Sequence, residues 1–212
     1  LSNEMEKPRT KLDVNEIDKT VRIATGKQGD KVFKFDTILS ETARQEDVFD
    51  TCSPRIDQAL DGLHATSFAY GQTGAGKSHT MAGPKDGPEE ERGLLPRAFE
   101  HVFNDIQAAD QGVTQFLVRA SFLEIYNEEI RDLLYKNGQK KLDLKDKDTG
   151  VYVKDLSTFV VKTTGDLMDV FNEGNVNRHV GATNMNEHSS RSHAVFTITV
   201  ESSELGDDGK AH

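Results

Sequence analysis

This chain of 212 residues has a single cysteine and fewer basic than acidic residues. Its 26 lysine and arginine residues are outnumbered by 36 aspartate and glutamate residues, so the formal net charge is −10. This acidic balance argues against nucleic acid as the main partner, because phosphate backbones bind basic surfaces. The single Cys52 excludes an internal disulfide and is typical of a reducing compartment. We expect Cys52 to be a half-buried packing residue rather than a nucleophile, because no base accompanies it.

Long apolar runs are also absent. No stretch is long enough to span a bilayer, so we expect no membrane insertion. Residues 1–6 contain no apolar signal-peptide core. The chain begins with Leu1 rather than methionine, and we expect it to be part of a longer protein.

The most informative motif is residues 71–78, which fit the phosphate-binding pattern G-x-x-x-x-G-K-[ST]. The glycines allow a tight turn that brings backbone N–H groups close to phosphate oxygens. In this motif the lysine reaches the β- and γ-phosphates, and the serine hydroxyl binds the Mg²⁺ ion. We expect a buried strand at residues 66–70 and a helix from the motif through Met81. This context disfavours a chance match in a Gly-rich turn. The predicted phosphate-binding residues are Gly71, Gln72, Thr73, Gly74, Ala75, Gly76, Lys77 and Ser78.

Hydrophobic patterning predicts strands that alternate with helices. The expected strands are residues 21–24, 31–35, 116–126, 151–153, 158–161 and 194–200, with the first two forming a hairpin. The expected helices are residues 46–63 with an interruption at Pro54, 94–106, 165–177, and a short one at 129–134. Residues 83–93 are expected to be an exposed polar loop. The arrangement predicts an α/β domain with a central sheet flanked by helices.

A second polar segment covers residues 184–193, just before the last expected strand. Its sequence, Asn-Met-Asn-Glu-His-Ser-Ser-Arg-Ser-His, has too many polar groups for a core. Serine hydroxyls beside an arginine suit a loop that senses a terminal phosphate. A Ser- and Asn-rich turn is an equally good interpretation of the chemistry alone.

Residues 68–81 and 186–193 resemble the P-loop and switch I of kinesin motor domains, in the order and separation of that family. The resemblance extends over the whole chain. Residues 122–128 and 132–134 resemble the family's middle signature. Residues 150–156 and 178–184 look most like the kinesin II subfamily, whose members serve intraflagellar transport. The resemblance implies a P-loop NTPase fold of kinesin type.

The same resemblance implies a role for each matching position. Lys77 would hold phosphates, Ser78 would bind Mg²⁺, and His79 would pack near the adenine of ATP. Ser189 and Ser190 would close on the γ-phosphate, with Ser190 also near Mg²⁺. Asn186 would help to place the attacking water, and Arg191 would pair with a switch II glutamate. Arg178 would join this network. Such a site acts mainly by positioning and by stabilising charge.

Several parts of the family pattern have no match in the chain. The first strand with its adenine-cradling Arg-x-Arg-Pro segment is missing, and Lys7-Pro8-Arg9 is not a substitute. Nothing matches the Asp-Leu-Ala-Gly segment of switch II, and we expect Glu201 to be an exposed residue at a strand end instead. The chain therefore looks like the N-terminal part of a motor domain, residues 1–212. We expect it not to hydrolyse ATP at a motor's rate by itself.

Residues 136–147 form the one clearly basic stretch of the chain. A solvated loop or hairpin is a sufficient interpretation of its composition. The resemblance adds a second interpretation, in which Lys140, Lys141, Lys145 or Lys154 touches tubulin.

The resemblance implies an ATP- and Mg²⁺-dependent microtubule motor and ATPase. It also implies a second motor subunit joined through a stalk, and a place on the cytoskeleton of the cytoplasm, cilium or flagellum. The alternative is a kinesin-like nucleotide-binding module without motor activity. An unrelated P-loop kinase or small GTPase is disfavoured by the switch I match, and no guanine-reading Asn-Lys-x-Asp is present.

Overall fold

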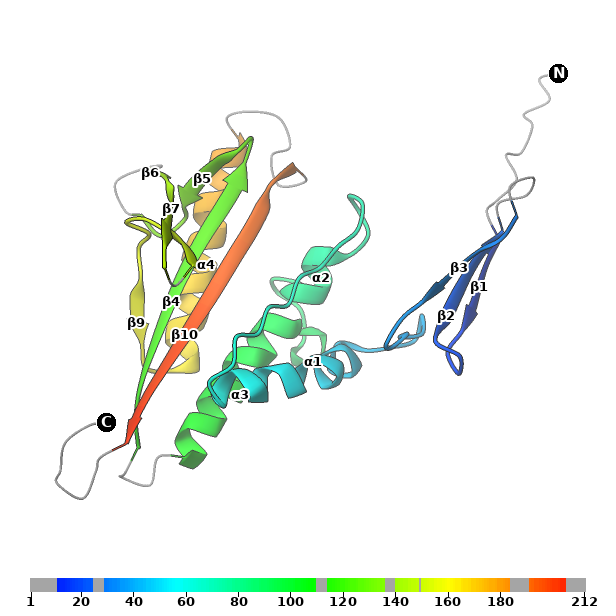
Figure 1. Cartoon of the computed structure of the whole chain (residues 1–212), viewed down its shortest axis with the longest axis horizontal. Coiled ribbons are helices and arrows are strands. Elements are labelled where there is room, and N and C mark those ends of the chain that lie inside the picture. The colour runs from blue at the N-terminus through cyan, green and yellow to red at the C-terminus, as the bar shows by residue number, and fades with distance from the viewer. Residues whose placement is uncertain are drawn as a thin grey trace.

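The computed structural model describes residues 11–24, 29–109, 114–135, 140–148, 150–183 and 191–204. These residues form three sheets, and every strand pairing among them is antiparallel (Figure 1). Helices pack beside the largest sheet, so the chain is a mixed α/β structure. None of the described helices is both long and apolar enough to cross a bilayer.

The first sheet consists of β1 (Lys11–Asn15), β2 (Thr20–Ala24) and β3 (Lys31–Lys34). The predicted hairpin is confirmed, because β2 and β3 pair from Thr20–Lys34 to Ile23–Lys31. Its hydrophobic side chains stay largely in solvent, and Val32 is 62% exposed. Figure 1 shows this sheet at one end of the molecule, away from the second sheet.

The second sheet is built on two long strands, β4 (Thr114–Tyr126) and β10 (His193–Glu204), which pair from Thr114–Glu204 to Ile125–His193. β9 (Phe159–Val161) and β5 (Glu129–Asp132) also pair with β4, and β6 (Lys140–Leu142) extends the sheet beyond β5. A separate hairpin, β7 (Leu144–Lys147) with β8 (Gly150–Val153), follows β6. Glu201 is exposed as predicted, although β10 runs beyond it, and it forms an ion pair with Arg119 on β4.

The predicted short helix at residues 129–134 is wrong, because these residues begin with β5. Asn127 and Glu128 have φ values of 49° and 63°, so they turn the chain in the left-handed region. Two consecutive residues of this kind make the tight type I′ connection of a hairpin. The turn directs Ile130 back along β4, opposite Ile125. Turn geometry therefore overrides the apolar spacing that indicated a helix.

Three long helices agree with the predicted segments: α1 (Gln45–Leu60), α3 (Leu94–Ala109) and α4 (Thr164–Thr183). α1 continues through Pro54, which lacks the N–H that would bond to the Asp50 carbonyl. The Ser53 hydroxyl lies 3.4 Å from that carbonyl oxygen and partly replaces the missing donor. Cys52, also on α1, is half-buried as predicted.

A capping box starts α4. The Asp166 carboxylate accepts the backbone N–H groups of Lys162 (2.7 Å) and Thr163 (3.0 Å), while the Thr163 hydroxyl accepts that of Asp166 (3.1 Å). These hydrogen bonds, that from Lys162 above all, hold the pKa of Asp166 below its usual value.

Four phenylalanine rings join α3 and α4 to the second sheet. Phe122 on β4 stacks on Phe171 of α4 at 5.7 Å between centroids, and its register partner Phe196 on β10 contacts it edge-on at 5.2 Å. Phe99 of α3 lies 5.2 Å from Phe196 and 6.1 Å from Phe171. α3 and α4 therefore pack side by side on one face of the sheet.

The predicted buried strand at residues 66–70 is wrong: the segment is unpaired and exposed, with Phe68 at 81% and Tyr70 at 94%. Its apolar and β-forming residues suit a strand, but a strand also needs a neighbour for its backbone groups. Among the described strands none pairs with it. The helix predicted through Met81 is present as α2 (Lys77–Met81).

Candidate phosphate-binding site

The loop of residues 71–78 makes a tight turn that ends in α2. Gly74 and Gly76 have φ values of 82° and 85°, a region that disfavours any side chain. The Ala75 N–H donates to the Gln72 carbonyl at 3.2 Å, and the Thr80 N–H donates to the Gly76 carbonyl at 2.9 Å. A Cβ added at Gly74 or Gly76 would meet open space, so their backbone faces are accessible to a ligand.

Lys77 folds back over the loop that precedes it. Its ammonium group donates to the carbonyl oxygens of Gly71 at 2.7 Å and of Gln72 at 2.8 Å. The positive charge is thus held against the backbone carbonyls of the turn, while the glycines remain exposed. A half-buried cation beside accessible backbone fits an anion such as a phosphate group. The geometry of the loop is therefore compatible with the phosphate ligand that its sequence predicts.

A buried glutamine attaches α2 to α1. Gln45 is 7% exposed, and its amide nitrogen lies 2.7 Å from the His79 carbonyl oxygen and 3.0 Å from His79 Nδ1. An amide NH₂ can only donate, so Nδ1 of His79 is the acceptor and the ring proton belongs on Nε2. His79, predicted to pack near adenine, thus has its orientation set by Gln45. No local sequence pattern indicates this contact, because Gln45 lies 34 positions away from His79.

Residues 83–93 leave α2 and return to start α3 at nearly the same point. The Gly93 N–H donates to the Ala82 carbonyl at 3.2 Å. A Cβ on Gly83 would lie 2.5 Å from the Glu91 carbonyl oxygen, so the close approach requires glycine. The insertion is mostly exposed, as predicted, and includes a 3₁₀ turn at Glu89–Glu91.

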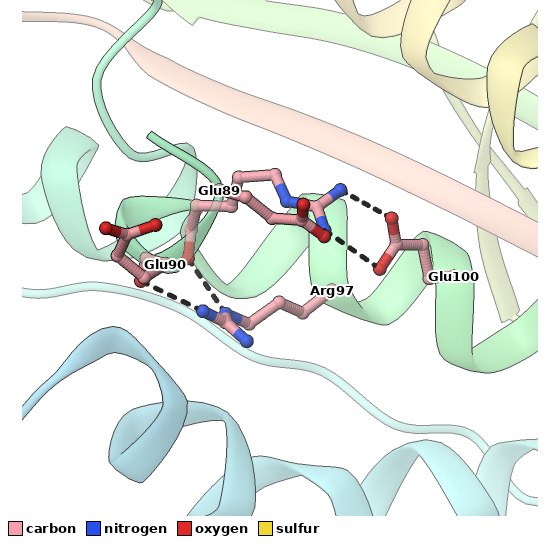
Figure 2. A network of polar contacts seen from close by, with 5 residues as sticks. Glu89, Glu90, Arg97 and Glu100 are labelled. Atoms are coloured by element: carbon pink, nitrogen blue, oxygen red, sulfur yellow. Dashed lines mark hydrogen bonds and ion pairs between the residues drawn. The ribbon is translucent and has the colours of Figure 1, made fainter. Parts of the chain in front are cut away.

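Arginines brace this insertion against α3 (Figure 2). Arg92 forms ion pairs with Glu89 and with Glu100 on α3. Arg97 of α3 donates to the backbone carbonyls of Arg92 (2.9 Å) and Glu90 (3.0 Å). The loop is therefore a structured insertion between two helical segments.

The predicted switch segment lies mostly outside the described residues: Asn186, Ser189 and Ser190 are not described, so their placement is untested. Arg191 is described and exposed. Next to it, Ser192 accepts a hydrogen bond from Arg178 Nη2 at its hydroxyl (2.8 Å) and a longer one at its carbonyl (3.3 Å). The structure thus brings Arg178 of α4 to the end of this segment.

Arg178 is in turn held by Glu124, a residue that the sequence prediction gave no role. The Glu124 side chain is 8% exposed and lies 3.2 Å from Arg178 Nε. A buried carboxylate requires such a partner. The available signal was a charged residue between apolar neighbours in a long strand, within the segment Phe122-Leu123-Glu124-Ile125.

The basic stretch forms strands that lie largely in solvent. Lys141 forms an ion pair with Glu129, and this contact, with help from Arg131, holds the pKa of Glu129 below its usual value. Lys147 lies 4.5 Å from the centre of the Tyr152 ring. Lys145 and Lys154 are exposed, and neither forms an ion pair with a described residue.

A G-x-x-x-x-G-K-S loop that runs into a helix, with its lysine held over the turn, places the chain in the P-loop class of proteins. Within that class the chain belongs to the kinesin motor domain family, whose family model matches residues 2–212.

Individual relatives agree with this assignment. The chain is 52% identical to "Kinesin-like protein KIF3C" of Bos taurus over 184 residues, which are 86% of this chain and 23% of the relative. It is 53% identical to the protein of the same name from Mus musculus over the same shares. It is 46% identical to "Kinesin-like protein klp-20" of Caenorhabditis elegans over 196 residues, 91% of this chain and 30% of the relative. These relatives support the resemblance to kinesin II. The chain spans between a fifth and a third of their length.

Proposed function

We propose that this chain is the nucleotide-binding part of an ATP-driven microtubule motor. The observation that carries the proposal is the accessible glycine turn of residues 71–78 with the Lys77 ammonium held inside it, in a chain of the kinesin motor domain family. ATP bound with Mg²⁺ supplies the phosphoanhydride bond whose hydrolysis drives such a motor.

Each residue of the loop has a defined part in holding that ligand. The backbone N–H groups of residues 71–76 would surround phosphate oxygens. Lys77 would exchange its two carbonyl contacts for phosphate contacts, and Ser78 would provide a hydroxyl ligand for Mg²⁺. His79, oriented by Gln45, would lie beside the adenine.

The segment that would close over the terminal phosphate begins beyond α4. We assign Ser189 and Ser190 to the γ-phosphate, Ser190 also to Mg²⁺, Asn186 to the attacking water, and Arg191 to a partner in switch II. Arg178 would fix the end of this segment through Ser192, with Glu124 keeping the guanidinium in place. Because Arg178 touches the segment rather than the phosphate, it is a positioning residue.

Microtubules are the proposed track, and the exposed lysines of the β6–β8 region are the proposed contact within this chain. The whole protein would act with a second motor subunit on the cytoskeleton of the cytoplasm, cilium or flagellum, in intraflagellar transport. The alternative, a module that binds nucleotide without movement, shares the loop and differs in the response to microtubules.

The loop is tested in the full-length protein by Lys77→Ala and a fluorescent ATP analogue. We expect useful binding to be lost, because the variant removes the cation that sits in the turn. The matched control is Lys85→Ala, an exposed lysine in the insertion, which should bind like wild type. Affinity of Lys77→Ala within a few-fold of wild type would contradict the phosphate site. If binding behaves as expected but microtubules do not stimulate turnover in the wild type, the alternative holds.

A further inference from the structure

Away from the phosphate loop, α1 and α3 bring together one imidazole and two carboxylates. His101 Nε2 on α3 lies 2.6 Å from Asp57 Oδ1 on α1 and 3.5 Å from Asp105 Oδ2, one turn further along α3. The three potential ligand atoms all lie within 4.8 Å of one another. We propose that Asp57, His101 and Asp105 form a binding site for a divalent transition-metal ion of the zinc type, which links α1 to α3.

The helices themselves create this arrangement. His101 and Asp105 are four residues apart, so their side chains share one face of α3. α1 packs against that helix (Figure 1) and supplies the third ligand from a different segment. Phe49 of α1 meets the His101 ring edge-on, with 5.7 Å between the ring centroids. This contact helps to hold the imidazole with Nε2 toward the carboxylates.

The distances suit a metal ion of this class. Ligand atoms about 2.0–2.2 Å from a tetrahedral zinc ion lie about 3.3–3.6 Å from each other. The His101–Asp105 separation of 3.5 Å already has this value. The His101–Asp57 separation of 2.6 Å is that of a hydrogen bond, and it must open by less than about 1 Å, given the same tetrahedral spacing. The Asp57 side chain is 53% exposed, so it has room to rotate.

Charge and ligand type favour the same occupant. A single Nε2 proton can bridge to one carboxylate, yet two carboxylates face this nitrogen. A divalent cation would balance the negative charges of both carboxylates. One nitrogen with two oxygens suits zinc, whereas Mg²⁺ and Ca²⁺ prefer oxygen ligands in larger number. His101, Asp57 and Asp105 have side chains 27%, 53% and 48% exposed, which leaves access for the ion and for a water as fourth ligand.

Calorimetric titration of the chelator-treated full-length protein with Zn²⁺ tests this site, with Mg²⁺ in excess to fill oxygen-rich sites. Co²⁺ serves as the spectroscopic probe, because a tetrahedral site with nitrogen and oxygen ligands gives visible absorption. We expect His101→Ala to remove about one bound ion and the absorption, and Asp105→Asn to weaken the affinity by about tenfold or more. The matched control Asp50→Asn, an exposed carboxylate about 10 Å away along α1, should not change either.

A gain-of-function variant protects the test against misfolding. Asp57→His supplies a second imidazole and should bind Zn²⁺ more tightly than wild type. Saturating Zn²⁺ at about a hundredfold excess over its Kd should raise the Tm of the wild type by about 5–10 °C, and that of His101→Ala much less. Equal Zn²⁺ stoichiometry and equal Tm gain in wild type, His101→Ala and Asp105→Asn, all shown folded by circular dichroism, would overturn the site. So would the absence of any Zn²⁺ binding in the wild type.

Discussion

The described part of the chain has two regions that differ in how they are held together. Every buried hydrophobic side chain in it comes from residues 94–171, whereas residues 11–93 contribute none. Yet residues 11–93 contain the phosphate loop. In residues 94–171 the fold rests on close packing of rings, whereas in residues 11–93 it rests on a few hydrogen bonds. We infer that stability and nucleotide binding depend on different residues, and that each can be changed without the other.

The largest expected effect is in the packed region. Phe122 is 2% exposed and contacts Phe171 and Phe196, so Phe122→Ala should leave a cavity at the junction of sheet and helices. We expect it to cost about 3–5 kcal/mol in the free energy of unfolding. Urea denaturation of the motor domain that contains this chain measures the effect. The control Phe33→Ala removes a ring that is 45% exposed on β3, and an equal loss there would break the comparison.

A smaller effect of the same kind is expected at Gly174 on α4. A Cβ at this position would lie 2.2 Å from Phe122 Cδ1, a clash with a ring that already contacts Phe171 and Phe196. Alanine is the better helix former by about 1 kcal/mol, but overpacking costs about 1–3 kcal/mol. We therefore expect Gly174→Ala to be destabilising overall in thermal unfolding.

Gly165, also on α4, is the matched control for this substitution. Its added Cβ would meet Thr163 Oγ1 at an ordinary contact distance of 3.5 Å. Gly165→Ala should be neutral or slightly stabilising. If both variants stabilise the protein to the same extent, the packing between α4 and β4 is looser than described.

The exposed region is tested through the contact between α1 and α2. Gln45→Ala removes both hydrogen bonds to His79 and leaves the His79 carbonyl without this donor. The change should lower the free energy of unfolding by about 1–2 kcal/mol. We expect nucleotide affinity to fall by up to about tenfold, which is 1.4 kcal/mol, while the Tm changes less than in Phe122→Ala. The control Gln58→Ala affects an exposed glutamine of the same helix that bonds to Arg55. A fall in Tm without any change in nucleotide affinity would contradict the separation of the two regions.

The packed region was also the one that the sequence predicted best. Local patterns sufficed for α3, α4, β4 and β10, because their apolar residues face a core made from the same region. The strand expected at residues 66–70 failed for the opposite reason, since its partner does not lie nearby in the sequence. β5 was missed because two residues with positive φ, Asn127 and Glu128, decide its direction. The motif located the phosphate loop, but the contacts of Gln45 and Glu124 join positions 34 and 54 residues apart. No local pattern reports such pairs.

The smallest expected effect concerns the lysines of the β6–β8 region, which belong to the packed region by sequence but lie in solvent like residues 11–93. Lys141 is already paired with Glu129, whereas Lys145 and Lys154 are exposed and form no ion pair with the described residues. Microtubules are acidic, so the unpaired charges should contribute more to a contact with tubulin. Exposed charge pairs contribute about 0.2–1 kcal/mol each. The double change Lys145→Ala with Lys154→Ala in the complete motor should therefore weaken microtubule affinity by about twofold or more. It should also reduce the salt dependence of binding, because screening acts on these charges.

Basal ATPase activity without microtubules should stay near that of wild type, and Lys141→Ala should have the smaller effect on affinity. Co-sedimentation across a salt series measures all three proteins, and unchanged binding in the double variant would make the stretch a solvated hairpin with no part in the track contact.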